Sequence, residues 1–91
     1  MQKKQISIEA CLDDLFQEMI DFQKKRVLSK AQALDSRLTE DDVLQPHDVK
    51  VLRNDATWNY EDGVLAGYLS AQIAVRVKLR LLDENETGSL G

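Results

Sequence analysis

The sequence predicts an all-α fold: an antiparallel helical hairpin with a short-helix connector, dimerising into a four-helix bundle. Two long stretches, about 8–38 and about 60–83, repeat apolar residues with helical spacing. One proline and four glycines in 91 residues leave no turn clusters for a multistranded sheet. A chain this short buries only about 60–65% of its unfolded surface, and a lone hairpin buries less. We therefore expect one helical domain over 1–91 that completes its core by self-association.

The first predicted helix, about 8–38, has two apolar rows. Ser7 is the expected N-cap, and Glu9 places negative charge in the first turn, where the helix dipole favours it. The first row has the spacing of a coiled-coil seam and consists of Ile8, Leu12, Leu15, Met19 and Phe22. The second row is offset around the helix and consists of Phe16, Ile20, Val27, Ala31, Leu34 and Leu38. This helix has more apolar surface than one neighbour covers.

The connector, 39–59, contains several turn and capping signals. Thr39 with Asp42 resembles a capping box and predicts a turn or short helix at 40–44. Pro46 disfavours helical angles at the preceding residue and suits the start of a new helix, which we place at about 47–53. A break at 54–57 then precedes Asn59, the expected N-cap of the last helix, with Asp62 at its third position.

The last helix, about 60–83, is predicted to be apolar on more than one side. Leu65, Leu69, Ile73 and Val77 continue the apolar surface around it, and its polar residues form a narrow stripe of Gln72, Arg76 and Arg80. A helix of this kind is buried by more than one neighbour. Charged residues interrupt the apolar run, so it does not supply the roughly 20 apolar residues of a membrane span. Residues 1–6 and the tail 84–91 are expected to be frayed or flexible.

Gly67 is unfavourable in the interior of this helix, by about 1 kcal/mol relative to alanine. We therefore expect Gly67 and Ala71 to lie at a close helix crossing, either within the chain or between chains. If so, Gly67→Leu is expected to cost more than about 2 kcal/mol through overpacking.

Charge and cysteine content restrict the partners and the compartment. The formal net charge of −4 argues against nucleic acid or an anionic membrane as the main partner, because both attract basic surfaces. The short basic run at 24–26 is interpreted as a solvated helix face. The single cysteine, Cys11, excludes an intramolecular disulfide and suits a reducing compartment. With no apolar signal segment at the N-terminus, we expect a cytoplasmic protein.

No set of residues has the spacing of a known catalytic or cofactor site. Glu61 and Asp62 are neighbours in sequence and do not share a helix face, so they mark a helix start. Cys11 and His47 could form a nucleophile pair, but a structural thiol is the simpler reading of Cys11. We predict no enzyme, no cofactor and no metal ion.

The connector holds the densest group of metal-binding residue types: Asp41, Asp42, His47, Asp48 and Asp55. Their spacing matches no standard site, and helix capping explains several of them. A small metal- or ligand-binding protein that uses the connector 41–55 is the alternative function.

The leading prediction is a non-enzymatic protein–protein interaction module, such as a small adaptor, a chaperone-like protein or a regulatory subunit. It would act through its apolar helix faces, with a second copy or a helix of another protein as the partner. Trp58 and Tyr60 either plug the end of the bundle or anchor a partner, since both residue types are enriched in binding hot spots. The expected partner-binding residues are Trp58, Tyr60, Leu65, Gly67, Leu69 and Ile73.

Overall fold

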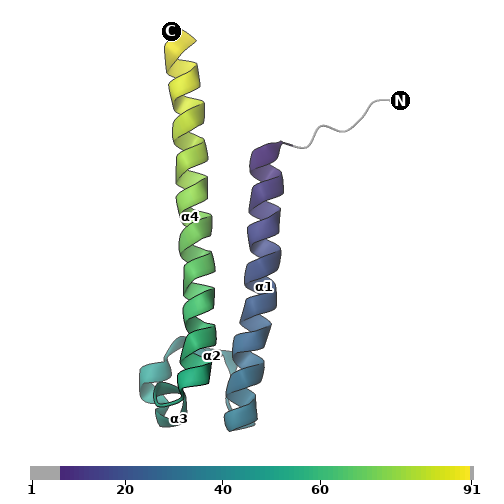
Figure 1. Ribbon diagram of the computed structural model, residues 1–91, viewed down its shortest axis with the longest axis vertical. Coiled ribbons are helices and arrows are strands. Elements are labelled where there is room, and N and C mark those ends of the chain that lie inside the picture. Colours follow the sequence, from purple (N-terminus) through teal and green to yellow (C-terminus); the bar gives the residue numbers. More distant parts are fainter. Residues whose placement is uncertain (1–6, 91) are drawn as a thin grey trace, which may run out of the picture.

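The computed structural model describes the backbone of residues 7–90 and the side chains of residues 7–84. Two long helices, α1 (Ile8–Leu34) and α4 (Ala56–Leu90), lie side by side and run in opposite directions (Figure 1). At one end they are joined by α2 (Glu40–Leu44), the 3-10 helix η1 (Pro46–Asp48) and α3 (Lys50–Arg53). No strand occurs in 7–90, and the predicted all-α hairpin with its short-helix connector is confirmed.

Helix α1 begins where the sequence predicts and ends earlier than predicted. The Ser7 hydroxyl oxygen accepts a hydrogen bond from the Ala10 N–H at 3.0 Å, which confirms the N-cap. The helix ends at Leu34 instead of 38, because the next residues form a turn. The Asp35 carboxylate accepts hydrogen bonds from the Arg37 N–H and guanidinium at 2.9–3.0 Å. This turn brings Leu38 back into the core, where it is buried.

Helix α4 begins at Ala56, four residues before the predicted start. Its capping residue is Asp55, whose carboxylate accepts the Trp58 N–H at 2.8 Å, so Asn59 as the N-cap is wrong. The Asn59 amide instead donates to the carbonyl oxygens of Leu52 and Asp55 at 2.9 and 2.8 Å and ties α3 to α4. The backbone remains helical to Leu90, seven residues beyond the predicted end. Residues 1–6 and 91 lie outside the described range.

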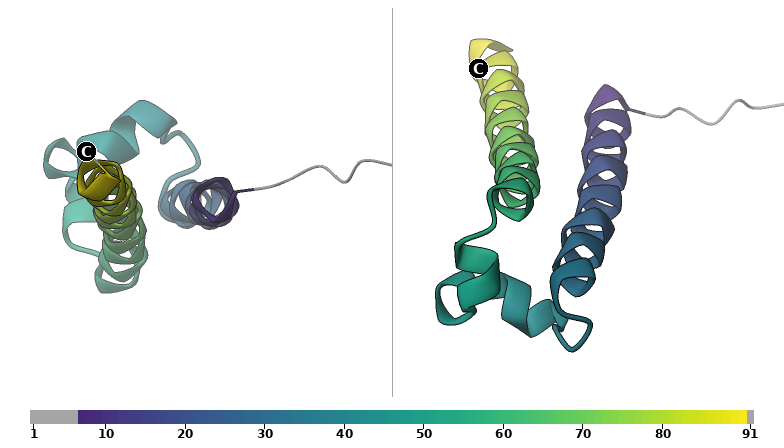
Figure 2. Two further views of the ribbon diagram at one scale, coloured as in Figure 1. Left: turned by 90° about the horizontal axis from the view of Figure 1, so that it is seen from above. Right: turned by 60° about the horizontal axis from the view of Figure 1, so that its bottom comes forward.

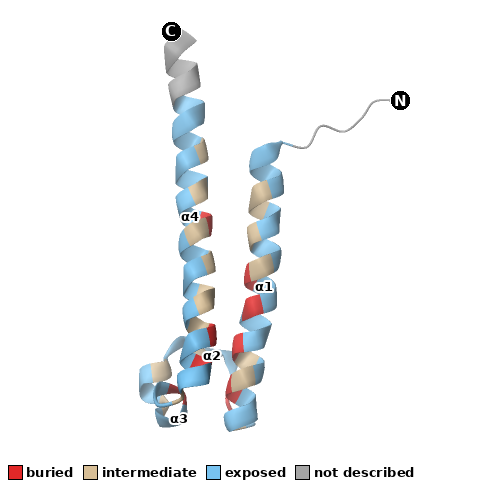
Figure 3. Ribbon diagram, in the orientation of Figure 1, coloured by how far each residue is buried: buried red, intermediate tan, exposed pale blue. Residues whose placement is uncertain are grey.

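The core lies at the connector end, between the two long helices and the short ones. Its buried residues are Val27, Ala31, Leu38, Leu52 and Trp58, and Figure 3 shows buried positions concentrated in this half of the hairpin. Trp58 is fully buried, and its indole N–H donates to the Val27 carbonyl oxygen at 3.1 Å. The Thr39–Asp42 cap is also confirmed, since the Asp42 carboxylate accepts the Thr39 N–H at 2.8 Å.

The connector packs on one side of the hairpin. Figure 2 shows it beside the two long helices when they are viewed from above. The opposite side is formed by α1 and α4 alone. None of the helices in the described part of the chain is long and apolar enough to cross a bilayer.

Candidate interaction surface

Polar side chains meet where α1 and α4 face each other near the open end of the hairpin. The Arg76 guanidinium binds the Asp13 carboxylate through two hydrogen bonds of 2.5 and 3.1 Å. These hydrogen bonds hold the pKa of Asp13 below its ordinary value. One turn nearer the connector, the Gln72 amide donates to the Gln17 side-chain oxygen at 3.3 Å, and Gln72 is buried. Two members of the predicted polar stripe of α4 therefore point at α1.

A second polar layer lies closer to the core. The Gln23 amide donates to the Glu61 side-chain and backbone oxygens, both at 2.9 Å, and both residues are buried. The Arg26 guanidinium forms an ion pair with Glu61 at 2.9 Å. The hydrogen bond from Arg26, followed by that from Gln23, lowers the pKa of Glu61. Glu61 is thus more than a helix-start residue, because it joins α4 to α1.

With polar residues in the contact between the helices, the first apolar row of α1 remains uncovered. Ile8, Leu15 and Phe22 are 70%, 51% and 68% exposed, while Leu12 and Met19 are half-buried. The apolar residues of α1 that are buried come from the second row: Ile20, Val27 and Ala31. At about 100° per residue, the first row lies roughly 100° around α1 from these buried positions.

Helix α4 adds apolar residues to the same side of the hairpin. In two right-handed helices that run antiparallel, rows displaced in the same rotational sense from the line of contact face the same side of the pair. On α4, the row roughly 90° before the line of contact with α1 therefore faces the same side of the hairpin as the first row of α1. The Arg26 guanidinium, on this side of α1, pairs with Glu61 at 2.9 Å, and Tyr60 directly precedes Glu61 on α4. The row on α4 consists of Tyr60, Val64, Tyr68, Ala71, Val75 and Leu82. We call the two rows together the hairpin face, and it lies opposite the connector.

A second apolar surface lies on α4 alone. Leu69, Ile73 and Val77 are 37%, 59% and 44% exposed and form what we call the α4 strip. It turns to the connector side of the hairpin, where α1 presents mainly polar residues. Leu65, predicted in the same row, is half-buried against the core.

Three of the predicted partner-binding residues lie in different surroundings. Trp58 has no exposed surface, which agrees with the reading that it plugs the end of the bundle. Tyr60 is 70% exposed on the hairpin face. A Cβ atom placed on Gly67 would meet nothing within 4 Å, so the close helix crossing predicted at Gly67 and Ala71 does not exist within the chain.

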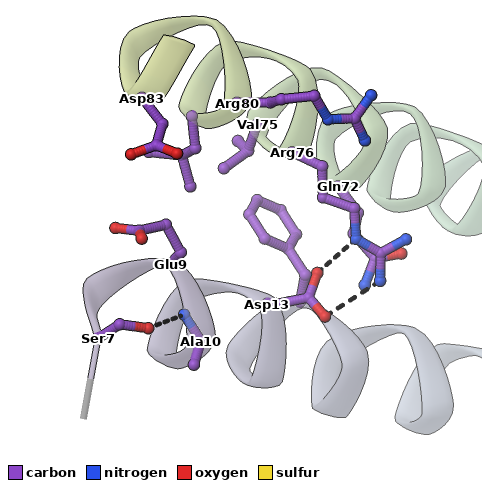
Figure 4. Close-up of a pocket in the computed structure, with 11 residues that line it drawn as sticks. Ser7, Glu9, Ala10, Asp13, Gln72, Val75, Arg76, Arg80 and Asp83 are labelled. Atoms are coloured by element: carbon purple, nitrogen blue, oxygen red, sulfur yellow. Dashed lines mark hydrogen bonds and ion pairs between the residues drawn. The ribbon is translucent and has the colours of Figure 1, made fainter. Parts of the chain in front are cut away.

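A cleft of about 490 Å³ opens between the free ends of α1 and α4. Phe16, Val75 and Leu79 form its apolar part, and the Asp13–Arg76 pair crosses one side of it (Figure 4). The Ser7 hydroxyl in its rim already accepts the Ala10 N–H. The cleft is a gap between the diverging free ends of the two helices.

The connector residues considered for a metal site are dispersed. Asp42 binds Thr39 and Asp55 caps α4, while Asp41 and His47 are exposed. Across 7–84 no three His, Cys, Asp or Glu side chains lie close enough together to hold a metal ion. Cys11 is exposed and unpaired near the start of α1, at the other end of the hairpin from His47.

Most of the exposed large apolar residues thus lie on two surfaces, with Leu34, Leu44, Val51 and Leu81 outside both, and the larger surface was only partly predicted. Leu69 and Ile73 belong to the α4 strip and Tyr60 to the hairpin face, but Ile8, Leu15 and Phe22 were not among the predicted partner-binding residues. Their heptad spacing was the signal that could have identified them. No family model, curated protein or solved structure matches this chain.

Proposed function

We propose that this chain is a non-enzymatic interaction module that dimerises through its hairpin face into a four-helix bundle. One observation supports this above all others: Ile8, Leu15 and Phe22 are each more than half exposed, while Gln23, Glu61 and Gln72 are buried between the helices. Water contact with large apolar side chains is unfavourable, and a contiguous apolar surface is typical of a binding site. A second apolar helical surface on the hairpin face removes this contact.

The exposed area of the single chain supports the same proposal. The chain exposes 7224 Å², about a third more than the roughly 5,400 Å² expected for a compact monomer of its mass. An open hairpin of two long helices exposes more surface than a compact domain, and a partner on the hairpin face would cover part of it.

Light scattering after size-exclusion chromatography tests the proposal, with matched variants. Wild type is expected to have twice the mass of one 10.3 kDa chain. Phe22→Ser removes a side chain that is 68% exposed on the hairpin face, and Leu44→Ser removes one that is 77% exposed on α2. Burying a phenylalanine contributes about 1.5–3 kcal/mol, so Phe22→Ser should weaken the dimer at least about tenfold. Leu44→Ser should leave it unchanged.

Circular dichroism of each variant verifies that the helices are intact. A wild-type protein that is well folded and monomeric over the whole concentration range would refute the proposal. Equal loss of dimer in the two variants would refute the assignment to the hairpin face.

A further inference from the structure

We infer that the two copies lie with their hairpin faces together and their connectors at the same end, so that α1 of each chain packs beside α4 of its partner. The inference rests on the proposed function, because it names the partner and its orientation on the same surface. The charge distribution along the two helices supports it, together with the position of the apolar rows.

Charge is segregated along α1. Between residues 8 and 22 every charged side chain is acidic: Glu9, Asp13, Asp14, Glu18 and Asp21. Between residues 24 and 34 every charged side chain is basic: Lys24, Lys25, Arg26 and Lys30. The acidic half of α1 therefore lies at the open end of the hairpin and the basic half at the connector end.

Helix α4 has the opposite order in space. It carries Glu61 and Asp62 near the connector, no charge from 63 to 75, then Arg76, Lys78 and Arg80, and after them Asp83 and Glu84 at the open end. The Asp13–Arg76 and Arg26–Glu61 pairs show that unlike charges of the two helices lie at the same level. Between residues 13–30 of α1 and 61–80 of α4, one helix is thus negative where the other is positive.

The apolar rows limit how a second hairpin can be placed. The row on α1 is centred on Leu15 and the row on α4 near Ala71, which lie at similar levels because Gln17 contacts Gln72. Full overlap of two hairpin faces therefore requires these centres to coincide. With the connectors at opposite ends, the apolar rows can overlap in two ways. The first places the acidic segment 8–22 of α1 against the same segment of the partner's α1. The second runs α1 parallel to the partner's α4, with charges of the same sign at the same height along the helices.

With the connectors at the same end, the acidic segment 8–22 of α1 lies beside residues 64–82 of the partner's α4. Those residues include three basic side chains and no acidic one. At the connector end, the basic residues of α1 lie beside the acidic start of the partner's α4. Asp13, Arg76, Arg26 and Glu61 are already paired within the hairpin. At about 100° per residue, Glu18 of α1 and Lys78 of α4 lie on the outer edges of the hairpin face, and connectors at the same end bring Glu18 and the partner's Lys78 to the same edge. Opposite charges at the edges of an apolar seam favour one orientation of helices in coiled coils, and this pair favours the arrangement inferred here.

Distances between spin labels on the two chains test the orientation. Ser29 is exposed near the connector end of α1, and a label at Ser29→Cys in a Cys11→Ser background gives one label per chain. With connectors at the same end, helices packed 8–10 Å apart hold the two labels within roughly 25 Å. With connectors at opposite ends and Leu15 at the centre, the labels are roughly 40 Å apart at 1.5 Å per residue. Pulsed electron paramagnetic resonance distinguishes these distances.

Lys25→Cys provides a second label position, for which the opposite-ended arrangement gives roughly 30 Å along the axis. Dilution with excess unlabelled protein should abolish the short distance at both positions, as required of a distance between chains. A dimer with the long distances would overturn the orientation and leave the proposed function standing. If the labelled protein and the unlabelled wild type are both monomeric by light scattering, the proposed function and this inference are refuted together.

Discussion

Replacing Gly67 by alanine should stabilise the protein. The position lies in the interior of α4, and an added Cβ atom would meet nothing within 4 Å, so no steric cost opposes the change within the chain. Alanine is favoured over glycine in a helix interior by about 1 kcal/mol, because glycine loses more backbone freedom on folding. For a domain of this size, about 1 kcal/mol raises the melting temperature by roughly 4–8 °C.

Thermal unfolding followed by circular dichroism at 222 nm measures the shift. All samples need the same chain concentration, since the melting temperature of a dimer depends on it. Gly63→Ala is the matched control, because Gly63 also has nothing within 4 Å of an added Cβ and lies on the outer side of α4. A lower melting temperature for Gly67→Ala alone would refute the reasoning. It would show that a backbone from a second chain approaches Gly67, as the sequence suggested.

Three other substitutions test the core, the helix start and the polar contact. Trp58→Phe should lower the free energy of unfolding by about 2 kcal/mol in urea titrations, because it removes the hydrogen bond to Val27 and part of a fully buried ring. Asp55→Ala should cost about 1 kcal/mol in the same assay through loss of the cap on α4, and no change would show that α4 needs no cap there. Glu61→Gln should be less stable than wild type at pH 7, and the gap should narrow as the pH falls below 4.5. The reason is that the pKa of Glu61 is lowered in the folded state from its ordinary value of 4.5, so its contribution is present above that pH and is lost as the folded carboxylate becomes protonated. A gap that stays constant from pH 7 to pH 3 would contradict the role given to the carboxylate.

The architecture could be predicted because helical spacing and capping signals are local. Ser7 and the Thr39–Asp42 pair lie at helix starts as expected, and both long helices follow their apolar periodicity. The errors are also local: Asp55 and Asn59 are equally good capping residues, and only the fold of the connector selects Asp55. The end of α1 depended on Asp35, whose bonds to Arg37 form a turn that apolar spacing does not reveal.

The direction in which each apolar row points could not be predicted from one helix alone. Helix α1 has two rows, and the choice between them depends on which polar residues of α4 find partners across the contact. Asp13 and Gln17 are spaced four apart, as are Gln72 and Arg76, and the two pairs match only in the antiparallel hairpin. The second row of α1 packs against Leu52 and Trp58, these polar pairs continue the contact towards the open end, and the first row is left facing outward. Trp58 is buried for a similar reason, because its indole reaches a carbonyl oxygen on the other helix.

The hydrogen-bonded pairs between α1 and α4 also prevent the helices from sliding along each other. Two purely apolar helices could shift by one turn, about 5.4 Å, and still pack with similar area. Here such a shift would separate Gln23 from Glu61 and leave buried polar groups without partners, which costs about 1–3 kcal/mol for each group. These contacts therefore favour one alignment of α1 and α4, in which each outward-facing residue has a defined position along the helix axis.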